Sequence, residues 1–328
     1  MKLDSVRELK LLWQEKIIAS AEQRNRSPIA ARSLATAIHT RSLALGVSQA
    51  TKQDYKLAIR VQQRSLLESQ EVKELAKRSR QEVDIRYVGR IGRRTLPWQM
   101  TRKRPLQIGA SVGHFKVTAG TLGCFVRPSG GGPLLLLSNN HVLANENHAK
   151  KGDAIVQPGI YDGGDVPKDV IGTLWRFKRL KKSGSNQVDA AVASLQDDVQ
   201  VKHTLYRPGK KLKGLGEEWV EVGNVVWKNG RTTQVTQGRV TAFEMDNVVV
   251  DFSDGAIRFD NQIEIEGADK HAFSDGGDSG SLIVGEDHLA LALLFAGSDS
   301  GGSNQQGLTY ANPIHTVLKA LDIELALD

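Results

Sequence analysis

Three short segments in the second half of the 328-residue chain carry residue types suited to nucleophilic catalysis. His141 follows an apolar run in Leu-Ser-Asn-Asn-His-Val-Leu, Asp189 stands in Val-Asp-Ala-Ala-Val, and Ser279 lies in Gly-Gly-Asp-Ser-Gly-Ser. Acyl transfer to a serine needs a base that takes the hydroxyl proton, a carboxylate that orients this base, and backbone donors for the oxyanion. We therefore expect Ser279 as nucleophile, His141 as general base and Asp189 as the orienting carboxylate.

The residues around Ser279 could also supply the backbone donors. A glycine two residues before the serine leaves room for a strained turn, so the amides of Gly277 and Ser279 could point into one oxyanion hole. Two further aspartates, Asp197 and Asp198, follow Asp189 in a more polar stretch. They remain rivals of Asp189 for the orienting role.

Taken together, the three segments resemble the His, Asp and Ser motifs of the chymotrypsin-like (trypsin-like) serine proteases. The order matches, as do the gaps of 48 and 90 residues, and the resemblance covers most of 108–328. Residues 230–240 are similar to the stretch that opens the second barrel in bacterial members such as the streptogrisins and glutamyl endopeptidases. The resemblance implies two six-stranded antiparallel β-barrels with the triad in the cleft between them, and a serine endopeptidase acting on polypeptides.

The resemblance also suggests where a substrate would bind. Phe273 takes the position at the base of the specificity pocket, and since it is not an acid we favour cleavage after a neutral or apolar residue. Ser274 and Asp275 would line this pocket, and Asp275 would restore a basic preference if the alignment shifts. The edge strand that pairs with substrate backbone and a pocket wall correspond to Phe295-Ala296-Gly297 and to Gly307.

One departure from the family concerns the aspartate before the nucleophile. In secreted members a processed N-terminus inserts beside this aspartate, which is Asp278 here. In this chain about 100 residues precede the barrels, and the first sixteen residues carry charges throughout instead of an apolar leader. We hypothesise that Asp278 pairs instead with a basic residue of the connector or of the barrel itself.

The elements that must position these groups are predicted to be short strands. After Pro105, runs rich in Val, Ile and Leu alternate with Gly, Asn and Asp turns, which is typical of antiparallel sandwiches and barrels. We expect a protease domain over 105–328, with a first barrel to about 215, a second barrel over 216–312 and a final helix over 313–326. The predicted strands are 113–118, 121–126, 134–138, 154–157, 172–177, 190–194, 219–222, 225–228, 233–243, 248–252, 262–265, 281–284, 289–297 and 307–311.

The preceding part has a different period. Residues 1–80 are predicted to be helical, because Leu9, Trp13 and their neighbours recur at helical spacing, and a helix is expected over about 49–79. Residues 81–104 are expected to form a basic connector. The segment 44–51 is similar to the turn of a bacterial helix-turn-helix, but Lys52 stands where an apolar residue would pack the recognition helix.

Charge is divided unevenly between these parts. Residues 1–104 hold 23 Lys and Arg against 10 Asp and Glu, whereas residues 105–328 hold 21 against 27. We favour a regulatory or docking role for the first part, with a regulatory protein partner bound through 1–104, over nucleic-acid binding. The alternative function is a catalytically idle barrel scaffold whose basic N-terminal region binds nucleic acid or a protein partner.

Composition narrows the remaining classes. Cys124 is the only cysteine, so no intrachain disulfide can form, which fits a reducing compartment. The longest apolar runs, such as 289–295, are far shorter than the roughly 18 residues of a membrane span. No residue spacing predicts a metal site, and we expect no cofactor, no membrane contact and a cytoplasmic, bacterial protein.

Overall fold

The computed structural model describes residues 1–25, 43–62, 64–88, 96–205, 210–218, 220–268 and 270–327. The chain separates into two compact units, Met1–Thr95 and Leu96–Asp328. The predicted connector 81–104 is divided between these units, with 89–95 outside the described residues. Within the described ranges, no helix is both long and apolar enough to cross a membrane.

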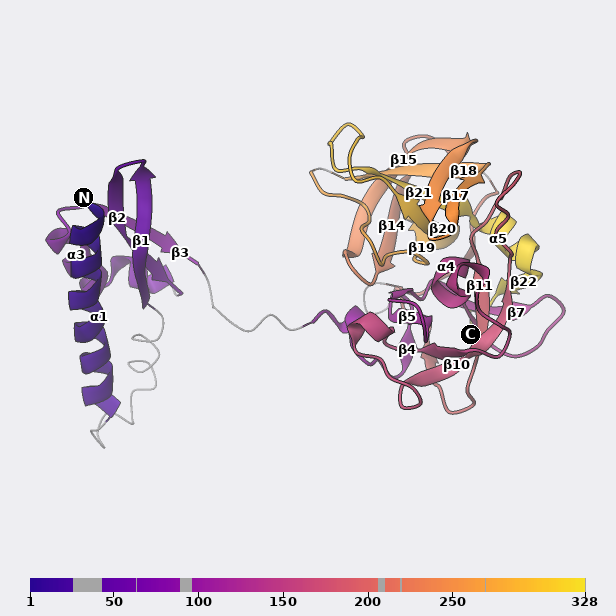
Figure 1. Ribbon diagram of the computed structural model, residues 1–328, viewed down its shortest axis with the longest axis horizontal. Coiled ribbons are helices and arrows are strands. Elements are labelled where there is room, and N and C mark those ends of the chain that lie inside the picture. The colour runs from indigo at the N-terminus through magenta and orange to yellow at the C-terminus, as the bar shows by residue number, and fades with distance from the viewer. Residues whose placement is uncertain are drawn as a thin grey trace. The chain divides into compact units, whose positions relative to one another are not determined.

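The first unit is a small mixed α/β structure (Figure 1). Its three-stranded sheet has the order β1-β2-β3, with an antiparallel β1–β2 hairpin and a parallel β2–β3 pair. The chain passes from β2 to β3 through a short 3₁₀ turn, η2, and helix α3, as a parallel connection requires. The bounds are α1 Leu3–Asn25, β1 Leu43–Thr51, β2 Asp54–Val61, η2 Arg64–Glu68, α3 Gln70–Arg78 and β3 Val83–Tyr87.

The prediction that residues 1–80 are helical is correct at α1 and α3 but wrong at β1 and β2. In β2, Leu57, Ile59 and Val61 alternate with less apolar residues and are fully buried, which is the period of a strand. The segment 44–51 lies in β1, so the resemblance to a helix-turn-helix turn does not correspond to the structure. The part of the predicted helical region at 26–42 lies outside the described residues.

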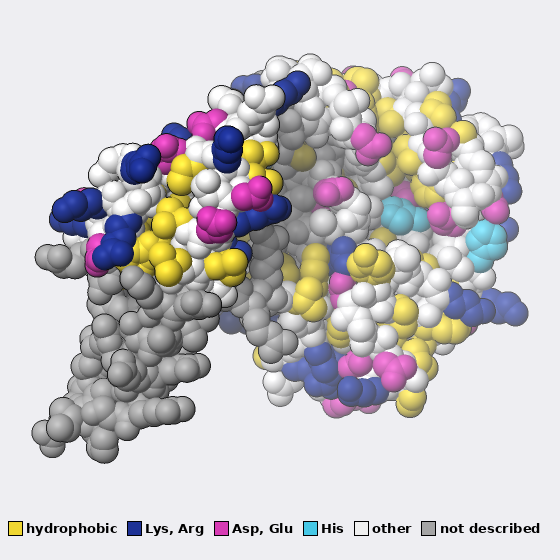
Figure 2. Space-filling view, turned by 60° about the vertical axis from the view of Figure 1, so that its left-hand side comes forward, with side chains coloured by type: hydrophobic (Ala, Val, Ile, Leu, Met, Phe, Trp, Pro, Cys, Tyr) yellow, Lys and Arg dark blue, Asp and Glu magenta, His cyan; other side chains and the backbone are white. Residues whose placement is uncertain are grey.

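Helix α1 packs on the sheet through residues at helical spacing. Val6 and Trp13 are buried with Leu57 and Leu75 in one cluster, whereas Leu12 is 49% exposed. Figure 2 shows further hydrophobic side chains gathered on the face of this unit that is turned to the viewer. The buried cluster that includes Val6, Trp13, Leu57 and Leu75 gives the unit a core of its own, as an independent domain requires.

The second unit begins with a curved antiparallel sheet. Its order is β22-β7-β8-β11-β10-β9-β5-β6. Strands β6 and β7 lie near opposite ends of this order, yet only Leu122 and Gly123 separate them in the chain. Leu122 lies between them and is paired with the segment before β5, since Gly109 N donates to Leu122 O and Leu122 N donates to Ala110 O, both at 2.9 Å. The bounds are β5 Ser111–His114, β6 Gly120–Thr121, β7 Cys124–Pro128, β8 Leu135–Ser138, β9 Ala154–Val156, β10 Val170–Phe177, β11 Ala191–Leu195 and β22 Ile323–Leu325.

The later strands form a closed six-stranded antiparallel barrel. The order β20-β19-β14-β15-β18-β21 returns to its start through direct β20–β21 pairing. A separate hairpin, β16–β17, extends between β15 and β18. The bounds are β14 Val225–Gly230, β15 Gln234–Met245, β16 Val248–Phe252, β17 Gly255–Phe259, β18 Gln262–Gly267, β19 Leu282–Gly285, β20 Leu289–Gly297 and β21 Leu308–Pro313; three two-residue strands are β4 Leu106–Gln107, β12 Val201–Lys202 and β13 Gly214–Leu215.

The mainly β, double-barrel fold class predicted from the sequence is thereby confirmed, with local corrections. No strand forms over the described residues of 219–222, and β17 and β22 were not predicted. The final helix, α5, spans only Ile314–Leu321, because Asp322 takes a left-handed conformation with φ 53°. This residue ends the helix and allows the chain to turn into β22, which pairs with β7.

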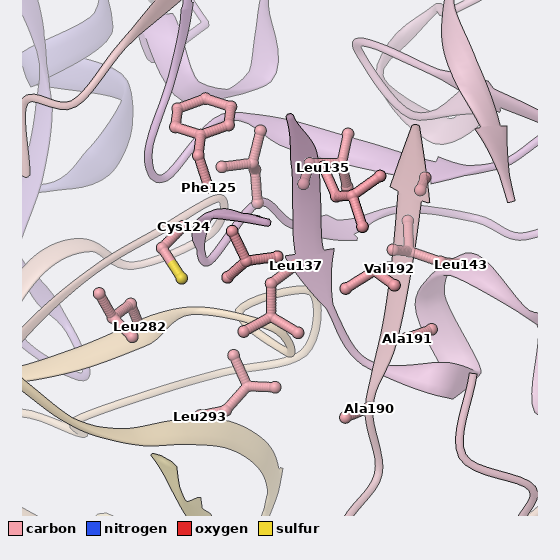
Figure 3. Packing of buried hydrophobic residues seen from close by; sticks show 14 of the residues in the cluster. Cys124, Phe125, Leu135, Leu137, Leu143, Ala190, Ala191, Val192, Leu282 and Leu293 are labelled. Carbon is pink, nitrogen blue, oxygen red and sulfur yellow. The ribbon is translucent and has the colours of Figure 1, made fainter. Parts of the chain in front are cut away.

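One hydrophobic cluster contains buried residues from both barrels. Cys124 and Leu137 of the first barrel lie in one cluster with Leu282 and Leu293 of the second, and all four are buried (Figure 3). A further cluster around Phe273 fills the second barrel. Interiors of this kind are close-packed, so the shared core fixes the two sheets against each other and with them the residues at their junction.

Burial of Cys124 generates a chemical prediction. Burial raises the pKa of its thiol to about 12, which leaves almost no thiolate near neutral pH. We expect a disulfide reagent such as 5,5′-dithiobis(2-nitrobenzoate) to leave the native protein unmodified at about pH 8, and to react with one thiol per chain once guanidinium unfolds it. Rapid reaction in native buffer would contradict the position of Cys124 in the core.

Candidate active site

His141 and Asp189 lie in direct contact on the first barrel. Strand β8 ends at Ser138, and the chain turns at once into the short helix α4, Asn140–Leu143, which carries His141. Asp189 precedes β11, the strand paired with β8. The distance from His141 Nδ1 to Asp189 Oδ2 is 2.5 Å, and the Asp189 side chain is fully buried whereas that of His141 is 22% exposed.

Asp189 is held in place by bonds at both of its oxygens and along its backbone. Its Oδ1 accepts from the amides of Asn140 at 2.7 Å and His141 at 3.2 Å, so Oδ2 remains for the imidazole. The Asn139 side chain donates to the Asp189 carbonyl at 2.7 Å. From the second barrel, Asn312 Oδ1 accepts from the Asp189 amide at 2.9 Å. These bonds fix the position of Asp189 and leave its Oδ2 directed at His141.

The charge of Asp189 controls the titration of His141. Burial opposes the charged imidazole, but the charge and hydrogen bond of Asp189, helped by the charge of Glu146, raise the pKa of His141 above 6.5. The Phe252 ring, at the end of β16, stands edge-on to the imidazole with the ring centroids 6.0 Å apart. Glu146 also accepts from the Ser253 amide at 2.9 Å, which ties the β16–β17 hairpin to the histidine loop.

Ser279 lies beside the histidine segment. Its carbonyl accepts from the Thr121 amide at 2.8 Å. A Cβ atom built on Gly120 would meet that carbonyl at 3.0 Å and the Val142 Cγ2 methyl at 2.4 Å, so the chain at Ser279 and the residue after His141 are close together. Among the described residues Ser279 makes no hydrogen bond to His141; such bonds often tighten only when substrate is bound.

The residue before Ser279 belongs to a buried ion pair. Lys228 Nζ of β14 lies 3.2 Å from Asp278 Oδ2, and both side chains are 0% exposed. Lys228 also donates to Thr233 Oγ1 and, at 3.1 Å, to the Gln234 carbonyl, so its three protons all have partners. Burial lowers the pKa of Lys228, and the neighbouring Asp278 charge opposes this effect. The hypothesis that a basic barrel residue pairs with Asp278 agrees with this geometry.

Further bonds hold the Asp278 carboxylate and shape the serine loop. Oδ1 accepts from the Thr232 amide at 2.8 Å, and Oδ2 accepts from Thr233 Oγ1 at 2.6 Å and from the Asp275 amide at 3.1 Å. The donors come from the loop between β14 and β15 and from the serine loop itself. One carboxylate therefore joins both loops at the base of the candidate site.

Two backbone carbonyls near Ser279, those of Gly276 and Asp278, are held in place by side-chain hydroxyls. Thr232 Oγ1 donates to the Gly276 carbonyl at 2.6 Å, and Ser281 Oγ donates to the Asp278 carbonyl at 2.6 Å. In a trans peptide the N–H points opposite to the C=O, so the amides of Gly277 and Ser279 point away from these hydroxyls. Neither amide donates to another group in the described part of the chain.

Gly277 must be glycine for two reasons. Its φ is 92°, and a Cβ atom there would lie 2.7 Å from Thr232 Oγ1 and 2.9 Å from Arg231 Nη1. Arg231 is fixed in turn by Asp162 of the first barrel, to which its Nε donates at 2.7 Å. Only 9% of the Arg231 side chain is exposed, so this ion pair is a second rigid link between the barrels beside the serine loop.

The predicted substrate-binding residues separate into two groups. Phe273 is 1% exposed inside the second barrel, so its ring does not line an open pocket. Phe295 is 3% exposed with its ring against Phe259, but the prediction for this residue concerned pairing through its backbone, which burial of the ring does not test. Their aromatic rings fill apolar cores because burial of that area is favourable. Of the other predicted residues, Ser274 on the serine loop and Ala296 on β20 are partly exposed and Gly297 is exposed, whereas Gly307, directly before β21, is buried.

Ser274 and Gly297 are brought together. Ser274 and Thr309 share a hydrogen bond of 2.6 Å between their hydroxyls, and a Cβ atom built on Gly297 would lie 3.5 Å from Ser274 Oγ. Gly307 has a φ of 87° and backs onto the Ser298 carbonyl, which a Cβ atom would overlap. Asp275 is exposed, and its Oδ1 accepts from the neighbouring Gly276 amide.

The rival aspartates lie elsewhere. Asp197 and Asp198 are exposed beyond the end of β11, and neither forms an ion pair or hydrogen bond with a histidine among the described residues. Sequence reasoning missed Asn139, Asn140 and Asn312, although the first two adjoin His141. An asparagine run after an apolar strand is a pattern that could have identified them, since Asn side chains commonly bond to nearby backbone.

Comparisons with known proteins find fold relatives only. No protein-family model and no curated protein matches the chain. It is similar to Thermobifida fusca protease A (16% identity over 68% of this chain and 99% of that chain, TM-score 0.47) and to Cellulomonas bogoriensis chymotrypsin (18%, 68% and 99%, TM-score 0.46). It is also similar to a glutamic-acid-specific serine protease (20%, 67% and 100%, TM-score 0.47).

The Lys228–Asp278 pair generates a stability prediction. Replacing Lys228 with Met keeps most of the side-chain volume but leaves a buried carboxylate without its counter-charge. Removing one partner of a buried pair costs about 3–5 kcal/mol, so chemical denaturation should show a loss of this size. The exposed Lys202 offers a matched control, and Lys202→Met should change stability by less than about 0.5 kcal/mol. Equal stability of the two variants would show that Asp278 does not depend on Lys228.

The His141–Asp189 contact generates a titration prediction. NMR of the imidazole should give a His141 midpoint above pH 6.5, with the charged form favoured by Asp189 and Glu146. Asp189→Asn should move the midpoint below 6.5, because only the smaller effect of Glu146 then opposes burial, and Glu146→Gln should lower it by a smaller amount. Glu324→Gln, at an exposed position of β22, should leave it unchanged. A midpoint insensitive to Asp189→Asn would refute this electrostatic account.

Proposed function

We propose that the protein is a serine endopeptidase in which Ser279 is the nucleophile. The single observation that carries the proposal is the 2.5 Å contact of His141 with the fully buried Asp189. A buried carboxylate that orients an imidazole beside a strained, glycine-rich serine loop is the arrangement that hydroxyl activation needs. The bonds of Asp189 to three asparagines hold this arrangement without help from a ligand.

The reaction follows from the tautomer that Asp189 imposes. With its proton on Nδ1 shared with Asp189, His141 presents an unprotonated Nε2 as the base. The Ser279 hydroxyl loses its proton to Nε2 as its oxygen bonds to the substrate carbonyl carbon. The tetrahedral intermediate then collapses, the scissile C–N bond breaks, and the imidazolium gives its proton to the leaving amine. Water, deprotonated by the same nitrogen, hydrolyses the acyl-enzyme and regenerates Ser279.

The amides of Gly277 and Ser279 would stabilise the negative oxygen of that intermediate. Support comes from the hydrogen bonds that orient the Gly276 and Asp278 carbonyls and so leave both N–H groups free to donate. Donors that are already oriented need no rearrangement as charge develops, which is where such sites gain most of their effect. The Lys228–Asp278 pair holds this loop, so the active conformation would not require a newly processed N-terminus.

A polypeptide substrate would bind as an added strand at residues 295–297. Strand β20 pairs with β19 up to Leu293 and through Leu294 with the serine loop, whereas residues 296–297 pair only with β21. The opposite edge therefore offers backbone groups for strand addition. Next to it, Gly297 leaves space bounded by the paired hydroxyls of Ser274 and Thr309, which suits a small or neutral side chain before the cleaved bond.

The first unit would act as a regulatory or docking module for a protein partner. The support is that it has its own core and carries most of the excess positive charge of the chain. The single, buried cysteine fits action in a reducing compartment such as the cytoplasm. Sequence-specific DNA reading by this unit loses its support because 44–51 lies in a strand, and contact with nucleic acid through positive charge alone remains the alternative.

A pair of serine variants tests the proposal. In the full-length chain, Ser279→Ala should abolish labelling by a fluorophosphonate probe and lower peptide hydrolysis by about 10⁴-fold or more, with an unchanged thermal unfolding curve. Ser300→Ala, at an exposed loop position, should keep both activities. Undiminished hydrolysis by Ser279→Ala would disprove the proposed role, and absence of labelling in the parent chain would do the same.

A further inference from the structure

A basic cavity lies on the protease unit, formed by residues that the proposed reaction does not use. Its volume is about 710 Å³, and its walls come from the segment between β10 and β11 and from helix α5. The cationic side chains that line it are Lys178, Arg179, Lys181 and Lys319, with His315 beside them. Glu218 is the one acidic side chain among its lining residues.

The positive charge of this cavity exceeds its negative charge, because four cationic side chains share it with one carboxylate, that of Glu218. None of the four Lys and Arg side chains forms an ion pair with a carboxylate in the described part of the chain. The cavity contrasts with the rest of its unit, because residues 105–328 carry six more acidic than basic side chains. Like charges gathered with too few counter-charges repel one another, so an anionic ligand would relieve an existing cost.

Both walls of the cavity are rigid. His315 and Lys319 stand one helical turn apart on α5, and His315 Nε2 donates to the Gly216 carbonyl at 2.8 Å. On the opposite wall the buried Asn186 side chain accepts from the Lys181 amide at 2.8 Å and donates to the Lys181 carbonyl at 2.9 Å. The charged ends are thus presented from fixed backbone, which lowers the entropy lost on binding.

The lining chemistry selects among anions. No Phe, Tyr or Trp side chain lines the cavity, and its one aromatic ring is the imidazole of His315, which is held by the Gly216 carbonyl, so the cavity offers little surface on which nucleobases could stack. Its apolar lining is limited to Val188 and Ala320, which offers little for the side chains of an acidic peptide. The hydroxyls of Ser185 and Thr316 and the cationic groups are all donors to oxygen, and phosphate oxygens accept from several such donors at once.

We propose that this cavity binds consecutive phosphate groups of a polyanionic ligand. The ligand is recognised through its phosphates and not through bases, so a single-stranded nucleic acid and an inorganic polyphosphate share the required chemistry. The binding experiment below separates these two sources.

The cavity is connected to the catalytic pair by hydrogen bonds. Asn140, next to His141, donates through its side chain to the Lys178 carbonyl at 2.7 Å, and the Lys178 amide donates to the Ala190 carbonyl at 2.9 Å. Asn147 Nδ2 donates to the Leu180 carbonyl at 3.0 Å. The wall that carries Lys178, Arg179 and Lys181 is therefore the segment that supports His141 and Asp189, and ligand binding should alter the reactivity of Ser279.

Binding is measured on full-length Ser279→Ala, so that the result does not depend on protease activity. The probe is a fluorescein-labelled oligothymidylate of about 20 nucleotides at about 50 mM salt, with inorganic polyphosphate and poly-L-glutamate as competitors. We expect the triple variant Arg179→Glu/Lys181→Glu/Lys319→Glu to bind at least tenfold more weakly. The slope of log affinity against log salt concentration should be smaller by about 2 in this variant, because three phosphate contacts are lost and each releases about 0.7 counterion.

Matched variants separate this site from general charge. Lys168→Glu/Lys202→Glu/Lys213→Glu makes the same charge change at exposed positions outside the cavity and should keep parental affinity. The neutral variant Arg179→Gln/Lys181→Gln/Lys319→Gln should lose an intermediate amount of affinity. It takes the place of the charge-reversed variant if that variant is unstable. Competition by polyphosphate but no oligonucleotide binding would assign the ligand to polyphosphate. Equal affinity of all variants, no binding of either phosphate polymer, or stronger competition by poly-L-glutamate would overturn the site.

The effect on catalysis rests on the proposed function and is tested separately. Saturating polyphosphate should change the rate of fluorophosphonate labelling of Ser279 at least threefold in the parent chain and in the exposed-lysine control, but not in the cavity variant. An unchanged rate in the parent chain, with binding intact, would overturn the coupling alone. Absence of any labelling would count against the proposed function and leave the binding result standing.

Discussion

The Lys228–Asp278 ion pair is the constraint on which the candidate site depends. Both side chains are fully buried, so the desolvation cost is met only because Lys228 uses all three protons and Asp278 accepts from several donors. These donors belong to the loop after β14 and to the serine loop, which the pair therefore holds as one body. In the function that we propose, this buried lysine would hold the serine loop in the way that a new chain terminus does in proteases made as precursors.

Polar contacts also hold the two barrels together at their junction. Asn312 of the second barrel bonds to the amide of Asp189, and Arg231 of the second barrel binds Asp162 of the first. Together with the shared hydrophobic core, these polar links fix the relative positions of the histidine and serine loops. Catalytic groups on different barrels keep their geometry only if such links are rigid, since displacement of about 1 Å can cost a hundredfold in rate.

Much of this structure could be predicted from the sequence, and the exceptions have physical reasons. The strand at 289–297 and the contact of His141 with Asp189 follow from local pattern and motif spacing. Strand β2 was predicted to be part of a helix over about 49–79, although its buried residues Leu57, Ile59 and Val61 alternate as in a strand. Phe273 was assigned to a pocket by counting from Ser279, but position along the chain does not reveal that a ring turns into the core. Lys228 could not be identified among 44 basic residues, because pairing with Asp278 is a long-range contact.

Strand β22 has a consequence for how the protein is made. It pairs with β7 through Leu325 and Val126, so the outer edge of the first barrel is covered by residues that leave the ribosome almost 200 positions later. At translation rates of about 5–20 residues per second, that edge of the nascent chain stays open for roughly 10–40 s. Open strand edges invite wrong pairing. The delay also means that the first barrel is completed only after the strands of the second barrel have been synthesised.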